Sequence, residues 1–183
     1  MRRATTYVVV VAAAAVLLTG CGRAIREGVG LGRGAKGIRA EIQPVAAAKD
    51  ARPLGSYSRF ELGPMQDDFG GNVPSELLRL LPGEFQKQLA EKELPNQPGG
   101  KTLLVRGRIL HYEAEGLFGL AFGDFEEVIA RVELVDKDTG RTVGTANCIG
   151  RTTESVNRGV EKKAEGLAKA IVGWIAERYP TKE

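Results

Sequence analysis

The sequence has few of the side chains on which most metal sites and nucleophilic enzymes depend. Its 183 residues include one histidine, two cysteines and one tryptophan, and aromatic residues make up 6% of the chain. A zinc site built from several histidines is therefore excluded, and a Ser-His-Asp or Cys-His pair could be assembled only around His111. Two cysteines also cannot supply a disulfide framework, so a hydrophobic core has to hold the fold.

Long apolar runs are scarce as well, and the longest lies near the start of the chain. Arg2 and Arg3 precede an unbroken run of apolar or small residues, Tyr7–Leu18. A helix needs about 20 apolar residues to span a bilayer, so this run is too short for a permanent anchor. A charged head, a short apolar middle and small residues at the end are typical of a cleaved secretory signal peptide, here residues 1–20.

Cys21 follows this leader directly, in the sequence Leu18-Thr19-Gly20-Cys21. These four residues resemble the box of bacterial lipoproteins, in which the cysteine is acylated on sulfur before the preceding bond is cut. The resemblance implies a lipid anchor in place of a spanning helix, because each buried methylene contributes about 0.8 kcal/mol and several acyl chains hold where one would not. Gly22, where some lipoproteins have aspartate, implies export to the outer membrane, facing the periplasm.

The segment after Cys21 is rich in glycine and in positive charge. Residues 22–53 hold seven basic and three acidic side chains, whereas residues 54–183 hold 17 basic and 20 acidic ones. We expect residues 21–54 to form a flexible tether, whose basic side chains either face anionic lipid headgroups or simply keep the linker solvated. Residues 55–183 have the usual size of one domain. The slightly acidic net charge of this domain and the export signal argue against a nucleic-acid partner.

Periodic patterns after the tether predict four strands and two helices. Alternating apolar residues indicate strands near 57–62, 103–109, 128–134 and 143–149. Helical spacing indicates helices over 75–94, kinked or divided at Pro82, and over 160–175. The stretch DKDTGR at 136–141 predicts a hairpin turn, in which Gly140 can take a positive φ. The order β-α-β-β-β-α predicts an α+β domain, an antiparallel sheet of about four strands with both helices packed on one face.

Three stretches of this domain carry a resemblance to a known family. They read LLVRGRILHYEAEG, VIARVELVDKDTGRTVGTANCIGR and GVEKKAEGLAKAIVGWIAERY. Together they resemble the uncharacterised bacterial lipoproteins grouped as domain of unknown function 4410, over roughly residues 57–179. The family has no established activity, so the resemblance implies a fold and an envelope location and no chemistry.

The titratable side chains are expected to be structural, and we expect no metal or other cofactor. Carboxylate pairs occur at Asp67-Asp68, Glu113 and Glu115, Glu126-Glu127, and Asp136 and Asp138. Each pair lies in or beside a predicted turn, where we expect solvated charge. A catalytic acid and base would instead need two environments that separate the pKa values of the two carboxyl groups. The stretch from Asp136 departs from a calcium loop at its fifth and twelfth positions. We expect Cys148 to be a buried inert thiol and His111 a structural residue at a sheet end.

The segment best suited to a function is the loop LFGLAFGDF, residues 117–125. Its apolar residues Leu117, Phe118, Leu120 and Phe122 are interleaved with glycines, a pattern that suits contact with a partner or a membrane. The alternative is that these side chains fold back over the sheet and complete the core. We therefore expect a non-enzymatic binding or adaptor domain for an envelope protein partner. The alternatives are a carrier of a small molecule or lipid, and a carboxylate-dependent cell-wall hydrolase.

Overall fold

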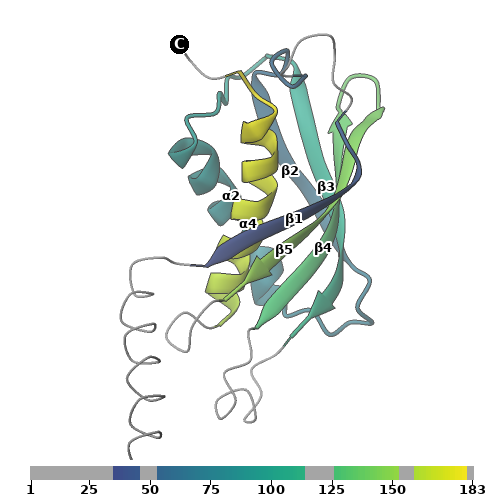
Figure 1. The fold of residues 1–183 in the computed structure, drawn as a ribbon, viewed down its shortest axis with the longest axis vertical. Helices are drawn as coiled ribbons and strands as arrows, with labels where there is room; N and C mark the ends of the chain where they lie inside the picture. Colours follow the sequence, from purple (N-terminus) through teal and green to yellow (C-terminus); the bar gives the residue numbers. More distant parts are fainter. Residues whose placement is uncertain (1–34, 46–52, 114–125, 153–158, 181–183) are drawn as a thin grey trace, which may run out of the picture.

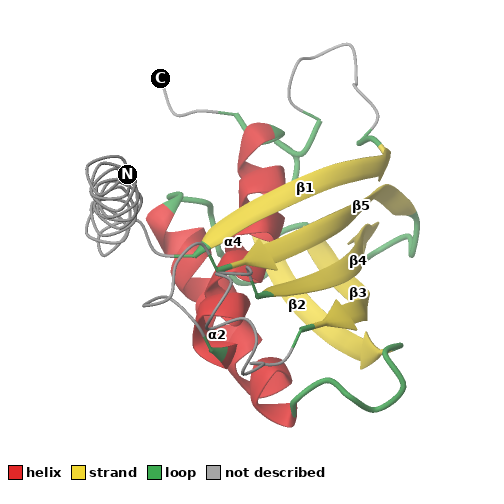
Figure 2. Ribbon diagram, turned by 60° about the horizontal axis from the view of Figure 1, so that its bottom comes forward, coloured by secondary structure: helices red, strands yellow, loops and turns green. Residues whose placement is uncertain are grey.

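The chain folds into a five-stranded mixed sheet with two helices on one side (Figures 1 and 2). The computed structural model describes residues 35–45, 53–113, 126–152 and 159–180. Along the chain the elements are β1 (Lys36–Gln43), β2 (Arg59–Asp67), α2 (Ser75–Glu91), β3 (Thr102–Tyr112), β4 (Glu127–Asp136), β5 (Thr142–Arg151) and α4 (Val160–Glu177). The strand order across the sheet is β1-β5-β4-β3-β2. The α+β class is confirmed.

Strands β3, β4 and β5 form where the alternating pattern predicts them. They pair antiparallel, and one residue in two along β4 is completely buried, for example Val128, Val132 and Leu134. The turn between β4 and β5 also has the predicted geometry, because Gly140 adopts a φ of 70°. Its N–H donates to the carbonyl oxygen of Asp136 at 2.8 Å, which closes the turn.

Strand β1 lies inside the segment that we expected to be part of the flexible tether, so that expectation is wrong for residues 36–43. The strand pairs antiparallel with β5, and Lys36 lies opposite Arg151. Its larger apolar side chains, Ile38 and Ile42, point away from the core and are 40% and 52% exposed. The strand therefore has no buried apolar face to reveal it in the sequence, and backbone pairing with β5 holds it instead.

Glycine allows β1 and β5 to lie directly against α4. A Cβ atom at Gly166 of α4 would lie 2.8 Å from the carbonyl oxygen of Lys36 and 3.0 Å from the Cα of Gly150. Real Cβ atoms do not approach backbone atoms so closely, so the short distance between helix and strands requires a glycine here.

The pairing of β2 corrects two further expectations. The sheet is not wholly antiparallel, because β2 runs parallel to β3. The helix between them is a crossover, and such a connection joins parallel strands. The strand also continues past the expected end at Gly63-Pro64, with a register shift between Leu62 and Met65. Proline is tolerated there because β2 is an edge strand, where a missing backbone donor costs no ladder bond.

Of the two alternatives predicted at Pro82, a kink or a division, the division does not occur, because α2 runs as one element over Ser75–Glu91. Pro82 is exposed, whereas Leu77, Leu81 and Phe85 are buried in the core. Burying such side chains contributes about 1.5–3 kcal/mol each, which offsets the roughly 3 kcal/mol cost of an interior proline. The helix packs mainly against α4 and meets the sheet only near β2. Helix α4 is therefore the element that covers the sheet.

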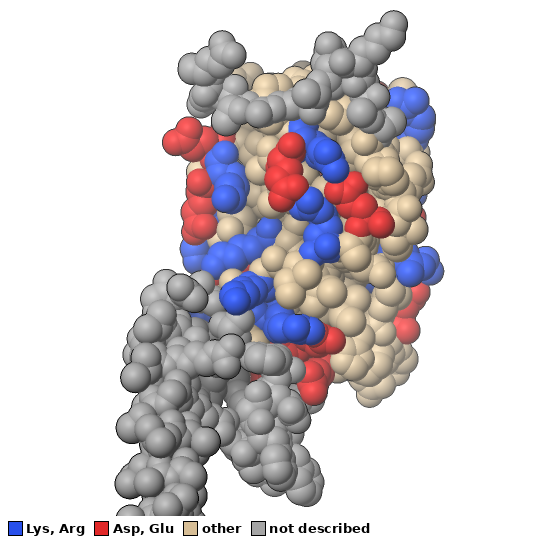
Figure 3. All heavy atoms as spheres, viewed as in Figure 1, with Lys and Arg blue, Asp and Glu red and all other residues tan. Residues whose placement is uncertain are grey.

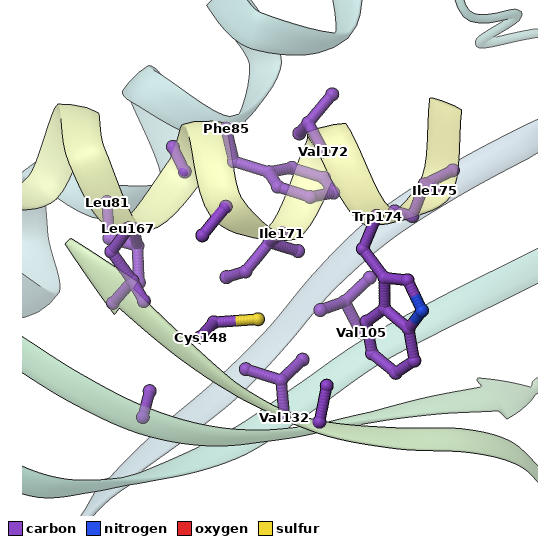
Figure 4. Packing of buried hydrophobic residues seen from close by; sticks show 14 of the residues in the cluster. Leu81, Phe85, Val105, Val132, Cys148, Leu167, Ile171, Val172, Trp174 and Ile175 are labelled. Carbon is purple, nitrogen blue, oxygen red and sulfur yellow. The ribbon is translucent and has the colours of Figure 1, made fainter. Parts of the chain in front are cut away.

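The core lies between α4, α2 and the inner face of the sheet (Figure 4). Leu167, Ile171 and Trp174 of α4 are fully buried above Val132 and Cys148 of the sheet, and Phe85 fills the space between the helices. The apolar stripe predicted for the last helix is confirmed. Over the described residues, neither helix has an apolar stretch of the length needed to cross a bilayer.

Candidate functional site

One end of the sheet gathers the chain segments with which we associate function. Lys36 lies opposite Arg151, Arg151 opposite Glu127, and Val128 opposite Tyr112. Four strand ends therefore lie on the same side of the sheet, in the lower half of Figure 1. They are the start of β1, the end of β3, the start of β4 and the end of β5. We call this the loop end of the sheet. Cys21 and the loop residues Leu117, Phe118, Leu120 and Phe122 lie outside the described residues, but both segments join the domain at this end.

A buried ion pair holds the loop end together. The Nζ of Lys163 lies 3.0 Å from Oε2 of Glu126, and the two side chains are 1% and 6% exposed. The same ammonium donates to the carbonyl oxygen of Glu113 at 2.6 Å and to the hydroxyl oxygen of Tyr112 at 3.3 Å. The pair thus connects the end of β3, the start of β4 and the first turn of α4. The expectation of solvated charge is wrong for Glu126, because α4 packs over it.

A second buried carboxylate lies at the opposite end of β4, in the hairpin turn. Asp136 is 2% exposed and accepts hydrogen bonds from the hydroxyl of Tyr57 at 2.9 Å and from the N–H and hydroxyl of Thr139, both at 3.0 Å. The ammonium of Lys101 lies 2.9 Å away. Solvated charge was expected here too, and the expectation fails because Tyr57 and Lys101, distant in sequence, close over the turn. Asp138 is exposed, as expected.

These partners set the protonation states around Asp136. Lys101 and the hydrogen-bond donors hold the pKa of Asp136 well below its usual range. Burial, together with the hydrogen bond to Asp136, raises the pKa of Tyr57 to about 12. A carboxylate held ionised by several donors is a weak proton acceptor, so this group stabilises the turn. It also lies far from Glu126, since β4 has ten residues and spans about 30 Å.

The remaining candidates have structural surroundings. The carboxylate of Asp67 accepts hydrogen bonds from the backbone N–H groups of Phe69 and Val73 at 2.7 and 3.2 Å. The ring of His111 meets the ring of Phe69 edge-on at 5.4 Å between centroids. Cys148 is completely buried, which raises the pKa of its thiol to about 12. Among the described residues, no group of three or more histidine, cysteine or acidic side chains could hold a metal ion.

The outer face of the sheet, which points away from α4, carries a hollow that our sequence reasoning missed. It measures about 520 Å³ over β2, β3 and β4, and its lining residues are Pro64, Gln66, Leu104, Arg106, Gly107, Arg108, Arg131 and Glu133. In the sequence these arginines appeared only as the polar positions of alternating strands. Register shows that they converge: Arg106 lies opposite Glu133, and Arg108 lies opposite Arg131.

Figure 3 shows the face of the molecule that is in view in Figure 1. Acidic and basic side chains are interspersed over the part of this face that the figure colours. A smaller hollow of about 260 Å³ between β1 and α4 contains Arg39, Lys169 and Glu177, and the guanidinium of Arg39 pairs with the carboxylate of Glu177. Its charges therefore already have partners.

Comparison with known proteins gives no match by sequence and distant matches by structure. No protein-family model and no curated protein sequence matches the chain. Two structures of a PelC dodecamer from Paraburkholderia phytofirmans have TM-scores of 0.49 and 0.47 at 15% and 12% identity, and each match covers 79% of this chain and 99% of that chain. A PDZ domain protein from Parabacteroides distasonis has a TM-score of 0.38 at 10% identity, over 77% of this chain and 36% of that chain. Similarity at this level transfers no function.

Proposed function

We propose that this protein is a lipid-anchored component of the bacterial cell envelope whose folded domain binds an envelope protein partner and catalyses no reaction. The anchor is Cys21, acylated after removal of residues 1–20, and the location is the periplasmic side of the outer membrane. The same proposal includes membership of the lipoprotein family named above. The lipoprotein box and the apolar leader support the location.

The observation that carries the binding role is the arrangement of the loop end. The chain from Cys21 enters the sheet at Lys36, and the flanks of the loop with Leu117, Phe118, Leu120 and Phe122 leave it at Glu113 and Glu126. Glu113 donates its N–H to the carbonyl oxygen of Glu127 at 2.9 Å, so the loop begins on the paired strands. Because both segments join the domain at the loop end, we infer that the apolar loop contacts partners at the membrane surface.

The buried carboxylates favour binding over hydrolysis. An acid and a base have to reach one substrate bond, but Glu126 and Asp136 lie at opposite ends of β4 and each has its own lysine. The carrier alternative needs an apolar cavity, whereas Trp174, Phe85 and Ile171 fill the space between helices and sheet. Among the described residues, neither the hydrolase nor the carrier has a specific observation in its favour.

Intact-mass measurement of the protein from its native host tests the anchor. We expect a chain that begins at Cys21 and carries fatty acyl chains. An unmodified thiol, or retained leader residues, would contradict the location.

Substitution of Phe118 and Phe122 by serine tests the loop. If these side chains contact a partner, the double variant should keep the melting temperature of the wild type and lose its association with larger envelope complexes on a native gel after mild detergent extraction. The matched control is Ile42→Ser, which removes an exposed aliphatic side chain from β1. A large fall in melting temperature would instead place the two phenylalanines in the core and reject the contact role.

A further inference from the structure

The outer face of the sheet contains a row of polar side chains on four adjacent strands, β2, β3, β4 and β5, and the row ends at Ala40 of β1. Gln66 lies opposite Arg108, Arg108 opposite Arg131, Arg131 opposite Asn147, and Asn147 opposite Ala40. We call this the arginine row. Its two guanidinium groups stand on adjacent antiparallel strands at directly opposed positions, where side chains lie about 5 Å apart at Cβ and like charges are destabilising.

The two arginines are only partly neutralised by the protein itself. Arg108 donates one N–H to the carboxylate of Asp68 at 3.1 Å, and both side chains are exposed to solvent. Arg131 donates to the side-chain oxygen of Asn147 at 3.3 Å and has no carboxylate partner within the described ranges. The next row differs, because there Arg106 meets Glu133 directly at 3.0 Å. A guanidinium has five N–H donors, so the arginine row retains donors for an external anion.

Apolar side chains flank the arginine row along the strands. Two residues toward the loop end, Ile129 lies opposite Ile149 and Ile149 opposite Ile38, and these side chains are half-buried or exposed. Toward the hairpin end, beyond Arg106 and Glu133, the half-buried Leu104 lines the hollow together with Pro64. A segment that runs along the strands from the loop end into the hollow therefore contacts the isoleucines first and the arginine row next. It then contacts the neutral Arg106–Glu133 ion pair and finally Leu104 and Pro64.

We propose that this hollow binds an extended acidic segment of the protein partner, with one carboxylate held between Arg108 and Arg131. Arginine binds carboxylates through paired N–H donors, and a carboxylate placed there would offset the repulsion of the two guanidinium groups. Rows of the sheet and same-side residues of an extended peptide both repeat at about 6.7 Å, so a segment aligned with the strands matches the rows. The hollow is lined by the apolar side chains of Pro64 and Leu104, by charged and polar side chains, and by no aromatic ring. A peptide with aliphatic side chains therefore fits it better than an acidic glycan, whose sugar rings stack on aromatic side chains.

This inference rests on the proposed binding role and is tested separately from it. The full chain, purified in detergent, is titrated into a short fluorescein-labelled peptide whose alternate residues read Leu, Glu, Thr and Leu, with serine between them. Anisotropy reports binding. We expect Arg131→Gln to weaken binding at least tenfold and raised salt to weaken it further, because the contact is between charges.

Stability measurements distinguish recognition from support of the fold. Because Arg131→Gln removes a like-charge pair, we expect its melting temperature to equal or exceed that of the wild type. The matched control is Arg79→Gln, an equal loss of charge at an exposed site on α2, which should leave peptide binding within twofold of the wild type. A second control peptide, with glutamine in place of glutamate, should bind at least tenfold more weakly.

Several results would overturn the inference while the proposed function stands. These are an absence of peptide binding by the wild type, equal binding by Arg131→Gln, and equal binding of the glutamine peptide. Competition by polygalacturonate that exceeds competition by unlabelled peptide would assign the hollow to an acidic glycan instead. Conversely, if Cys21 carried no lipid but the peptide bound as expected, the envelope location would fail and the site would stand.

Discussion

At the scale of single residues, the fold depends on buried charges that meet specific partners. Asp136 keeps its charge in a site that is 2% exposed, because Tyr57, Thr139 and Lys101 supply donors. Burial of a carboxylate without such donors would be very unfavourable. The turn therefore needs both the charge of Asp136 and the side chains that close over it.

Asp136 should make stability depend on acid pH. Its pKa in the folded state lies below its usual range, so its ionised form favours folding above the unfolded pKa of about 3.9, and this contribution disappears as pH falls from about 5 toward 2. We expect Asp136→Asn to lower the melting temperature at pH 7 and the difference from the wild type to narrow in acid. Tyr57→Phe removes one donor to a charged group and should cost about 1.5–3 kcal/mol.

The control for this experiment is Asp138→Asn in the same turn, since Asp138 is exposed. Thermal unfolding followed by circular dichroism across this pH range measures the effect. A difference between Asp136→Asn and the wild type that stays constant with pH would contradict the assignment of the charge.

At the scale of elements, the Lys163–Glu126 pair connects three pieces of secondary structure that share no local sequence. Lys163 belongs to α4, Glu126 precedes β4, and Glu113 follows β3. Oε1 of Glu126 is buried without a hydrogen-bond partner in the described part of the chain. The ion pair thus connects specific residues, but burying the unpartnered oxygen of Glu126 costs free energy, as is common for buried pairs.

Breaking this pair on one side should cost more than removing it completely. We expect Lys163→Met to destabilise the fold by about 3–5 kcal/mol, because it leaves the carboxylate of Glu126 buried and unpaired. The double variant Lys163→Met with Glu126→Leu should recover at least half of that loss. Urea unfolding measures both.

The neighbouring residue provides the control. Lys162 pairs with Glu165 at a partly exposed position, so Lys162→Met should change stability by no more than about 1 kcal/mol. A loss of less than about 1 kcal/mol for Lys163→Met, or a double variant less stable than the single one, would refute the account of the pair.

At the scale of the whole molecule, the sheet has two unlike ends. The loop end receives the chain from Cys21, whereas the hairpin of residues 136–141 lies about 30 Å away, at the far end of β4. As a random coil, residues 22–35 would average about 20 Å end to end. An acylated Cys21 would therefore keep the loop end nearer to the membrane than the hairpin.

Fluorescence quenching by brominated lipids tests this orientation. Single cysteines are placed at Glu161, an exposed residue at the start of α4, and at Asp138 in the hairpin, and each is labelled with a fluorophore in vesicles. Cys148 is completely buried and burial raises the pKa of its thiol, so we expect no labelling there and Cys148 can remain in place. We expect the label at position 161 to be quenched more strongly. Equal quenching, or stronger quenching at position 138, would contradict the orientation.

The sequence by itself determined the elements with a local signature. These elements were predictable because each depends on neighbours within a few residues. They are the alternating strands β3, β4 and β5, the apolar stripe of α4, and the turn at Gly140. The buried thiol of Cys148 followed from the same alternation.

Only the tertiary structure decided strand β1, the buried carboxylates and the arginine row, because each of these features depends on residues far apart in the chain. Strand β1 has no buried apolar face of its own and is recognised only when paired with β5. From the sequence we expected Glu126 and Asp136 to be solvated. Folding instead places Lys163 beside Glu126 and Lys101 beside Asp136, and both carboxylates are buried. The arginine row depends in the same way on strand register, which places Arg108 against Arg131 although 23 positions separate them in the sequence.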